Sequence, residues 1–201
     1  MVAETATKAE YLQDYLEKLA TLMREARGKM PGWKYLSMEE LVLKEGKLLS
    51  DEPFTAEEEE TLLRLFKAAP GPYKTKQCYY NAMLLMFEDE MIEEKLVYTE
   101  GYAFGHVIPA IHAWVTLNGK PVDVTWGEDM VGNGHNRARS PKRMLERVKY
   151  NLKRCRYWGI GFPREVVMKR VVDTGLSPSL IDDWENGNPL LKTGIPKKWK
   201  V

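Results

Sequence analysis

Apolar side chains recur at three- and four-residue intervals in the first part of the chain, a spacing typical of amphipathic helices. The pattern predicts a long helix over residues 8–27, which Gly28 ends. Ser37 and Thr55 each precede a glutamate by three residues, the capping-box pattern that opens a helix. We therefore expect a short helix after Ser37 that stops by Gly46, and a second helix after Thr55.

The spacing of apolar residues changes from helical to strand-like near the middle of the chain. Pro-Gly-Pro at 70–72 breaks the chain, and a helix is expected from about residue 76 to residue 91. Beyond it lie three segments rich in β-branched and aromatic residues, which predict strands. Asn118-Gly119 is a tight-turn signal, so the last two strands should form an antiparallel hairpin. The three predicted strands are 96–103, 110–117 and 121–126.

Residues 127–140 are polar and rich in glycine and asparagine, as in loops. Ser140-Pro141 matches an N-cap followed by a first-turn proline, and so predicts a basic helix. No clear period follows Asn186, which predicts a loosely packed tail. The remaining expected elements are that basic helix to about 154, a strand over 156–160, a helix from Pro163 to just before Gly175, and a short helix from Ser177 through Trp184.

Strands grouped after a helix, rather than alternating with helices, predict an α+β fold with an antiparallel sheet. We expect a central helix bearing a cysteine, packed on a small sheet and flanked by N- and C-terminal helices. The chain of 201 residues fits one domain, 1–201. Within it we distinguish a helical N-terminal extension (1–70), a core (71–165), and C-terminal helices with a tail (166–201).

The chain has 30 Lys and Arg residues and 29 Asp and Glu residues, so the charges nearly balance, but they are unevenly distributed along the sequence. Acidic residues cluster at 51–60 and 88–94, and nine basic residues against one acid occupy 137–156. Such runs are usually solvated helix faces. The basic segment 137–156 is also a candidate surface for an acidic protein partner, and less so for a nucleic-acid backbone.

Three features bear on the compartment in which the protein works. The two cysteines do not form a disulfide framework, and the polar amphipathic start lacks the apolar core of a secretory signal. No apolar run approaches the roughly 20 residues that a membrane helix needs. We therefore expect a cytoplasmic protein that is not inserted in a membrane.

Three residues combine into a possible thiol site. A thiol is a nucleophile only as thiolate, which the first turn of a helix and a nearby protonated histidine both favour. Cys78 lies at the predicted start of the central helix, and His112 lies within a predicted strand. An imidazole in that position needs a partner for its second ring nitrogen, and Asp123 lies on the next predicted strand.

The predicted hairpin places the aspartate within reach of the histidine. If Asn118 and Gly119 are the two turn residues, Leu117 opposes Lys120 across the hairpin. Asp123 is then the diagonal neighbour of His112 on the same face. Diagonal neighbours in a sheet lie about 7–8 Å apart, a separation that an Asp–His hydrogen bond can bridge.

Structural interpretations compete with the catalytic one. A cysteine near a helix start is more often a small buried apolar residue, and a single strand histidine is more often a satisfied core residue. His106, His112, His135, Asp123 and Cys78 could together hold a metal, but no ligand pair has helical spacing and Pro109 interrupts the 106–112 segment. We therefore expect neither a metal nor another cofactor.

Four sequence pieces in this order resemble the core of bacterial transglutaminase-like proteins, within the papain-like thiol superfamily. They are Cys78-Tyr-Tyr-Asn-Ala-Met-Leu-Leu, Tyr98-Thr-Glu-Gly-Tyr, His112-Ala-Trp-Val and Asp123-Val-Thr. The match covers about a quarter of the chain. Segments 123–126, 157–160 and 180–184 also resemble uncharacterised phage-encoded proteins. One departure is Gln77, which stands where the family often has glycine.

The resemblance implies that Cys78 is the nucleophile, His112 the base and then the acid, and Asp123 the residue that orients it. For the oxyanion we consider the Cys78 backbone N–H, with Gln77 or Tyr73 as the second donor. His106 is a candidate substrate contact, and Trp114 and Trp126 are core aromatics of which one could line the site.

Two functions follow as hypotheses. The first is an enzyme that forms an acyl-thioester on a protein or peptide substrate, and that passes the acyl group to water or to an amine. Hydrolysis of a peptide, isopeptide or amide bond is favoured because water is always available. The second is a non-catalytic binding protein that keeps the fold and contacts an acidic partner through the basic segment 137–156.

Overall fold

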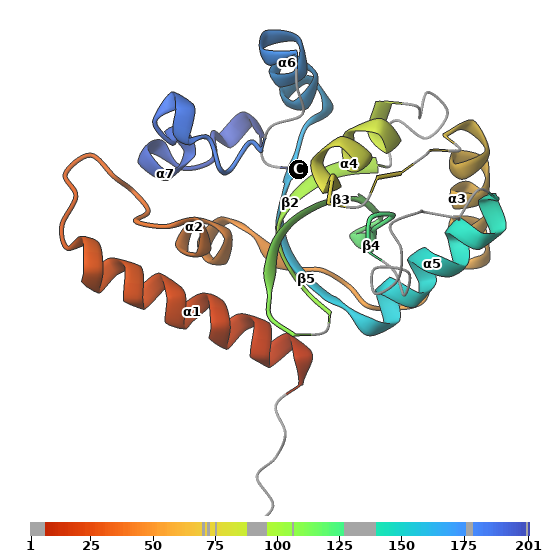
Figure 1. The fold of residues 1–201 in the computed structure, drawn as a ribbon, viewed down its shortest axis with the longest axis horizontal. Coiled ribbons are helices and arrows are strands. Elements are labelled where there is room, and N and C mark those ends of the chain that lie inside the picture. Colours follow the sequence, from red (N-terminus) through yellow and green to blue (C-terminus); the bar gives the residue numbers. More distant parts are fainter. Residues whose placement is uncertain are drawn as a thin grey trace, which may run out of the picture.

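The computed structural model describes residues 7–69, 71, 73–74, 76–87, 96–105, 107–126, 140–175, 179–199 and 201. Its centre is a curled antiparallel sheet with the strand order β1-β5-β2-β3-β4 (Figure 1). The α+β class is therefore confirmed. The strands are β1 (Lys47–Leu48), β2 (Leu96–Phe104), β3 (Ala110–Leu117), β4 (Lys120–Val122) and β5 (Arg156–Phe162).

Helices lie around this sheet, and three of them begin at the predicted caps Ser37, Thr55 and Ser140. Thr7, Ser37, Thr55 and Ser140 each accept a backbone N–H with their side chain at a helix N-cap. Gly175, in the left-handed conformation, ends α6 as predicted. The helices are α1 (Lys8–Arg27), α2 (Met38–Glu45), α3 (Ala56–Ala68), α4 (Cys78–Phe87), α5 (Pro141–Arg154), α6 (Arg164–Thr174) and α7 (Pro189–Thr193), with short 3₁₀ turns η2 (Trp184–Asn186) and η3 (Lys197–Trp199).

The helices form two groups on either side of the sheet (Figure 1). Helix α1 packs on α2 and on strands β2 and β5, whereas α3 packs on α5. Helix α4 packs on β3 and β2, with Ala82, Leu85 and Met86 buried as expected. The largest apolar cluster joins both groups through the sheet, and a smaller cluster surrounds Trp114. The N-terminal extension is not only helical, because β1 pairs with β5 at the edge of the sheet.

The β3–β4 hairpin has the predicted register. Leu117 pairs with Lys120, and Val115 with Val122. The predicted strand 121–126 is too long, however, because β4 ends at Val122. The Asp123 side chain accepts the backbone N–H of Thr125 at 2.8 Å, so the chain turns locally instead of continuing along the strand.

The C-terminal segment differs most from the prediction. Ser177 lies outside the described residues, and residues 179–183 are not helical. The tail after Asn186 is packed rather than loose, since Leu190, Leu191 and Ile195 are buried. The Leu191 carbonyl accepts the backbone N–H of Tyr35 at 2.9 Å, which joins the tail to the segment before α2. Contacts between distant segments, which leave no periodic pattern, order this part of the chain.

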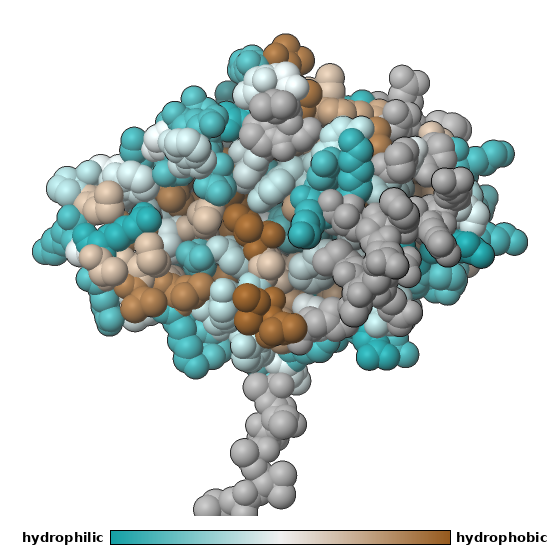
Figure 2. All heavy atoms as spheres, in the orientation of Figure 1, coloured by the Kyte–Doolittle hydropathy of each residue, from teal (hydrophilic) through white to brown (hydrophobic). Residues whose placement is uncertain are grey.

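Hydrophilic residues dominate the face seen in Figure 2, with apolar residues in smaller groups. One group lies on α6, at the top of this view, where Met168 and Val172 are exposed. Apolar residues scattered in this way are normal on protein surfaces. Among the residues that the structure describes, no helix is long and apolar enough to cross a membrane.

Strands β2 and β5 approach each other closely at two paired glycines, Gly101 and Gly159. A Cβ on Gly101 would collide with the Trp158 carbonyl oxygen and lie 2.6 Å from the Gly159 Cα. We expect Gly101→Ala to lower the free energy of unfolding in urea by about 1–3 kcal/mol, because the backbone must move to accept the methyl group. At Gly161 the added methyl group would meet only the side chains of Val97 and Val201, so Gly161→Ala should cost less. Equal losses in the two variants would contradict this explanation.

Candidate active site

A buried histidine–aspartate pair forms the centre of the site. The Nε2 of His112 lies 2.9 Å from Oδ2 of Asp123, and the two side chains are 3% and 0% exposed. His112 lies in β3, and Asp123 comes directly after β4, so the β3–β4 hairpin brings them together. The predicted proximity of the two residues is therefore confirmed, although Asp123 reaches His112 from a turn rather than from a strand.

Every oxygen of the Asp123 carboxylate has donors besides His112. Oδ1 accepts the backbone N–H groups of Thr125 at 2.8 Å and Trp126 at 3.3 Å. Oδ2 accepts the hydroxyl of Tyr157 at 3.0 Å, from strand β5. A buried carboxylate with this many donors is held as an anion in one orientation. It therefore fixes the direction of the His112 ring.

The contact between His112 and Asp123 shifts the pKa of both residues. Burial alone would lower the pKa of His112, but the charge and the hydrogen bond of Asp123 outweigh it and raise that pKa to about 10. Burial would raise the pKa of Asp123, but the charge of His112 and the hydrogen bonds to the carboxylate lower it. At neutral pH the pair is therefore an imidazolium and a carboxylate.

Cys78 is the third residue of the predicted site. It is half-buried and is the first residue of α4. Interactions with the Cys78 side chain add to the effect of Asp123 in raising the pKa of His112. Since Asp123 occupies Nε2, the ring nitrogen left for the thiol is Nδ1.

Asn81, which the sequence analysis did not single out, ties the thiol helix to the aspartate turn. Its amide accepts the backbone N–H of Lys74 at 3.0 Å and donates to the Lys74 carbonyl at 2.8 Å. The same Nδ2 donates to the Thr125 hydroxyl at 3.0 Å. Asn81 is fully buried, one helical turn after Cys78. It thus connects the loop before α4, the helix itself and the turn that holds Asp123.

Trp126 and Asn151 complete the surroundings of the pair. The Trp126 ring stacks on His112, with ring centroids 4.7 Å apart, and is only partly buried. Asn151, in the last turn of α5, donates to the backbone carbonyls of Asp123 at 2.9 Å and Trp126 at 2.7 Å. Helix α5 therefore holds the turn that contains Asp123 in place through the buried side-chain amide of Asn151.

The remaining predicted site residues differ in whether the structure places them at the site. Tyr73 is buried and donates its hydroxyl hydrogen to the Ala69 carbonyl at 2.5 Å, so that hydrogen is not available to an oxyanion. The Gln77 backbone N–H is directed at the Lys74 carbonyl at 3.3 Å, while its side chain is exposed. Trp114 is a core aromatic, as one of the two interpretations expected, whereas Trp126 lines the site. His106 lies outside the described residues.

A second buried carboxylate, Glu100, lies on β2 and was not foreseen. Its two oxygens accept the hydroxyls of Tyr98 at 2.8 Å and Ser179 at 2.6 Å. They also accept the backbone N–H groups of Leu180 at 2.8 Å and Ile181 at 3.1 Å. Burial raises the pKa of Glu100, and these donors oppose that effect. Glu100 thereby fastens segment 179–181 to the sheet, which explains why this segment is not helical.

Other polar groups near the site behave as ordinary core or surface residues. Burial raises the pKa of the Cys155 thiol to about 11, in agreement with an inert core cysteine. In the described part of the basic segment, Lys149 pairs with Glu59 at 2.9 Å and Arg156 with Asp51 at 2.6 Å. Binding of an acidic partner there stays a prediction, and residues 137–139 lie outside the described part.

Within the described ranges, no group of three or more His, Cys, Asp or Glu side chains is close enough together to hold a metal ion. The fold and the site thus define an α+β protein with a buried histidine–aspartate pair and a half-buried cysteine that affects the pKa of this histidine. No family model, curated protein or solved structure matches this chain.

Proposed function

We propose that the protein is a thiol enzyme in which Cys78 attacks a carbonyl group and His112 and Asp123 assist. The observation that supports this most directly is the buried His112–Asp123 pair, and the Cys78 side chain interacts with the same imidazole. A histidine held between a carboxylate and a thiol can keep the thiol as thiolate and move a proton.

The reaction begins with the thiolate and the imidazolium. The Cys78 sulfur attacks the carbonyl carbon and forms a C–S bond, while the Cys78 backbone N–H, at the start of α4, is free of helix partners and can face the oxyanion. The C–N bond breaks as His112 gives its proton to the leaving amine. His112 then takes a proton from water, the resulting hydroxide attacks the thioester, and the C–S bond breaks. The products are an amine and a carboxylic acid.

We favour hydrolysis of a peptide, isopeptide or amide bond in a protein or peptide substrate. A transfer of the acyl group to an amine instead of water uses the same triad and is the alternative. The resemblance to transglutaminase-like proteins is compatible with both outcomes. Cys78 is half-buried, so part of its surface is accessible to solvent.

The test is the rate at which iodoacetamide alkylates Cys78, followed by peptide mass spectrometry at several pH values. We expect Cys78 at about pH 6 to react at least ten-fold faster than an unperturbed thiol, because the imidazolium stabilises its thiolate. Cys155 serves as the internal control and should react slowly because it is buried.

Two histidine variants separate the role of His112 from a loss of folding. His112→Ala and His112→Gln should both reduce the rate at Cys78 toward that of a free thiol, while circular dichroism verifies that the fold persists. Alkylation of Cys78 at the rate of a free thiol in the native protein would exclude the proposed mechanism. An unchanged rate in a folded His112→Gln variant would exclude the role of the histidine.

A further inference from the structure

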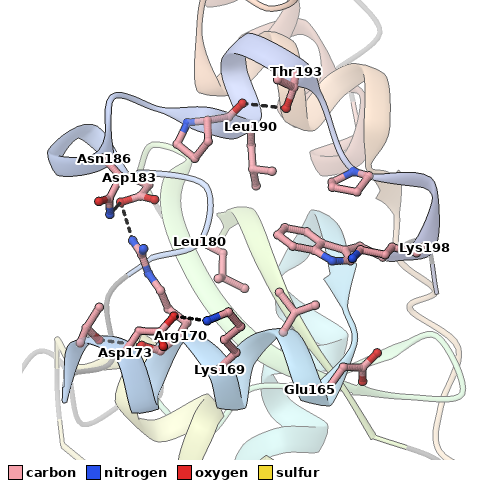
Figure 3. Close-up of a pocket in the computed structure, with 15 residues that line it drawn as sticks. Glu165, Lys169, Arg170, Asp173, Leu180, Asp183, Asn186, Leu190, Thr193 and Lys198 are labelled. Carbon is pink, nitrogen blue, oxygen red and sulfur yellow. Dashed lines mark hydrogen bonds and ion pairs between the residues drawn. The ribbon is translucent and has the colours of Figure 1, made fainter.

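A second concave site lies between α6 and the C-terminal segment, and the thiol site does not use it. Its cavity has a volume of about 820 Å³, within the range of small-molecule sites. Figure 3 shows α6 along one side and the segment containing Asp183, Leu190 and Lys198 around the other. Leu180, one of the residues that line the cavity, is held in place because its backbone N–H donates to the buried Glu100 carboxylate.

The walls of this cavity are mainly apolar. Val166 from α6 and Leu180, Leu190, Pro196 and Trp199 from the C-terminal segment line it. Leu180 and Leu190 belong to the protein core, so the apolar surface at the cavity is backed by rigid packing. Such a surface favours a ligand with an apolar body.

Most charged groups at the cavity are already paired. Arg170 Nη2 lies 2.5 Å from Asp183 Oδ1, and Lys169 Nζ lies 2.7 Å from Asp173 Oδ2 (Figure 3). Within each pair, the positive and the negative charge compensate each other. They leave the cavity with one further cation, Lys198, and one further carboxylate, Glu165, both on its exposed rim.

Two donors at the cavity lack acceptors among the residues that the structure describes. The Arg170 Nε is buried without a hydrogen-bond partner, although the rest of the guanidinium contacts Asp183. Lys198, which lies across the cavity from Arg170 in Figure 3, forms no ion pair or hydrogen bond within the described chain. The Arg170 Nε is buried and out of reach of a ligand, whereas Lys198 is exposed at the cavity and can pair with a carboxylate.

We infer that this cavity binds an amphipathic organic anion, with its apolar part along Leu190 and Trp199 and its carboxylate toward Lys198. Glu165 is the group that opposes this assignment, and a cationic ligand of the same shape is therefore the competing possibility. The inference is independent of the thiol chemistry at Cys78.

Calorimetric titration of the full chain with three probes tests the inference. Decanoate should bind with a stoichiometry of one, whereas acetate, which has the charge but no apolar body, should not bind. Decylamine, which has the same chain with the opposite charge, should bind at least about ten-fold more weakly than decanoate. Decylamine binding as tightly as decanoate, acetate binding, or no decanoate binding would each overturn the inference.

Two variants locate the binding site. Lys198→Glu should weaken decanoate binding at least about ten-fold, while the same change at the exposed Lys142 of α5 should leave it unaltered. Thr193→Trp places a large ring at the exposed mouth of the cavity and should abolish binding. Thermal unfolding verifies that each variant is folded. Binding that is insensitive to both Lys198→Glu and Thr193→Trp would show that decanoate binds elsewhere, and would overturn the assignment.

Discussion

Asp123→Ala is expected to lower the free energy of unfolding by about 3–5 kcal/mol, because it leaves His112 buried without its counter-charge. His112 is 3% exposed, so water cannot replace the lost carboxylate. The Tyr157 hydroxyl and the backbone N–H groups of Thr125 and Trp126 would also lose their acceptor. Urea unfolding at neutral pH measures the effect.

The matched control is Asp173→Ala, which removes an aspartate from an exposed ion pair with Lys169. Exposed pairs of this kind contribute little, so the urea midpoint should hardly move. Asp123→Asn is a second comparison, since it keeps the shape but removes the charge and should fall between the two. An Asp123→Ala variant as stable as Asp173→Ala would show that the buried pair does not support the fold.

The same pair predicts how stability depends on pH. The pKa of His112 is raised from 6.5 to about 10, so its contribution is complete below pH 6.5 and is lost as the pH rises through about 10. The pKa of Asp123 is lowered from 3.8, so its contribution is present above pH 3.8 and is lost as the pH falls through the lowered value. Asp123→Ala should therefore show a weaker loss of stability between pH 6.5 and about 10 than the native protein.

Glu100→Ala is expected to have an effect of similar size, about 3–5 kcal/mol, because four buried donors lose this acceptor at once and only the Ile181 N–H keeps another, the Ser179 hydroxyl. Two of these donors are the backbone N–H groups of Leu180 and Ile181, which no side-chain change can remove. The C-terminal segment should also detach from the sheet more often. Urea unfolding measures the first effect, and the rate of tryptic cleavage after Lys192 measures the second.

Glu185→Ala provides the control for the Glu100 variant, because Glu185 is an exposed glutamate in the same segment. It should alter neither the urea midpoint nor the cleavage rate. Glu100→Gln keeps the side-chain volume but turns an amide N–H₂ toward donors, so it should still be destabilising, although less than alanine. If Glu100→Ala neither lowered the free energy of unfolding nor accelerated tryptic cleavage, the conclusion that Glu100 holds segment 179–181 on the sheet would be disproved.

The periodic parts of the chain were predictable from sequence. Helix α1 and strand β3 follow from residue spacing, and helix α5 also from the Ser140 cap, which acts within one turn of the chain. The hairpin register was also predictable, because Asn118-Gly119 defines a two-residue turn and the pairing then follows by counting. The proximity of His112 and Asp123 depends only on this local geometry.

Contacts between segments distant in sequence were not predictable in this way. Asn81 and Asn151 are single polar residues on apolar helix faces, a signal that marks a buried amide but not its partner. Tyr157 reaches Asp123 only because β5 and the β3–β4 hairpin belong to one curled sheet. Ser179 has no local pattern that indicates its bond to Glu100, 79 residues earlier.

The sequence by itself therefore determined the α+β class, most helix starts, the hairpin, and the three residues of the candidate thiol site. Only the tertiary structure decided where β4 ends, how the C-terminal segment packs, and which donors hold Asp123 and Glu100. The physical reason is the range of the interactions. Caps, turns and amphipathic periods act within a few residues, whereas a buried carboxylate takes its donors from whichever segments the folded core places beside it.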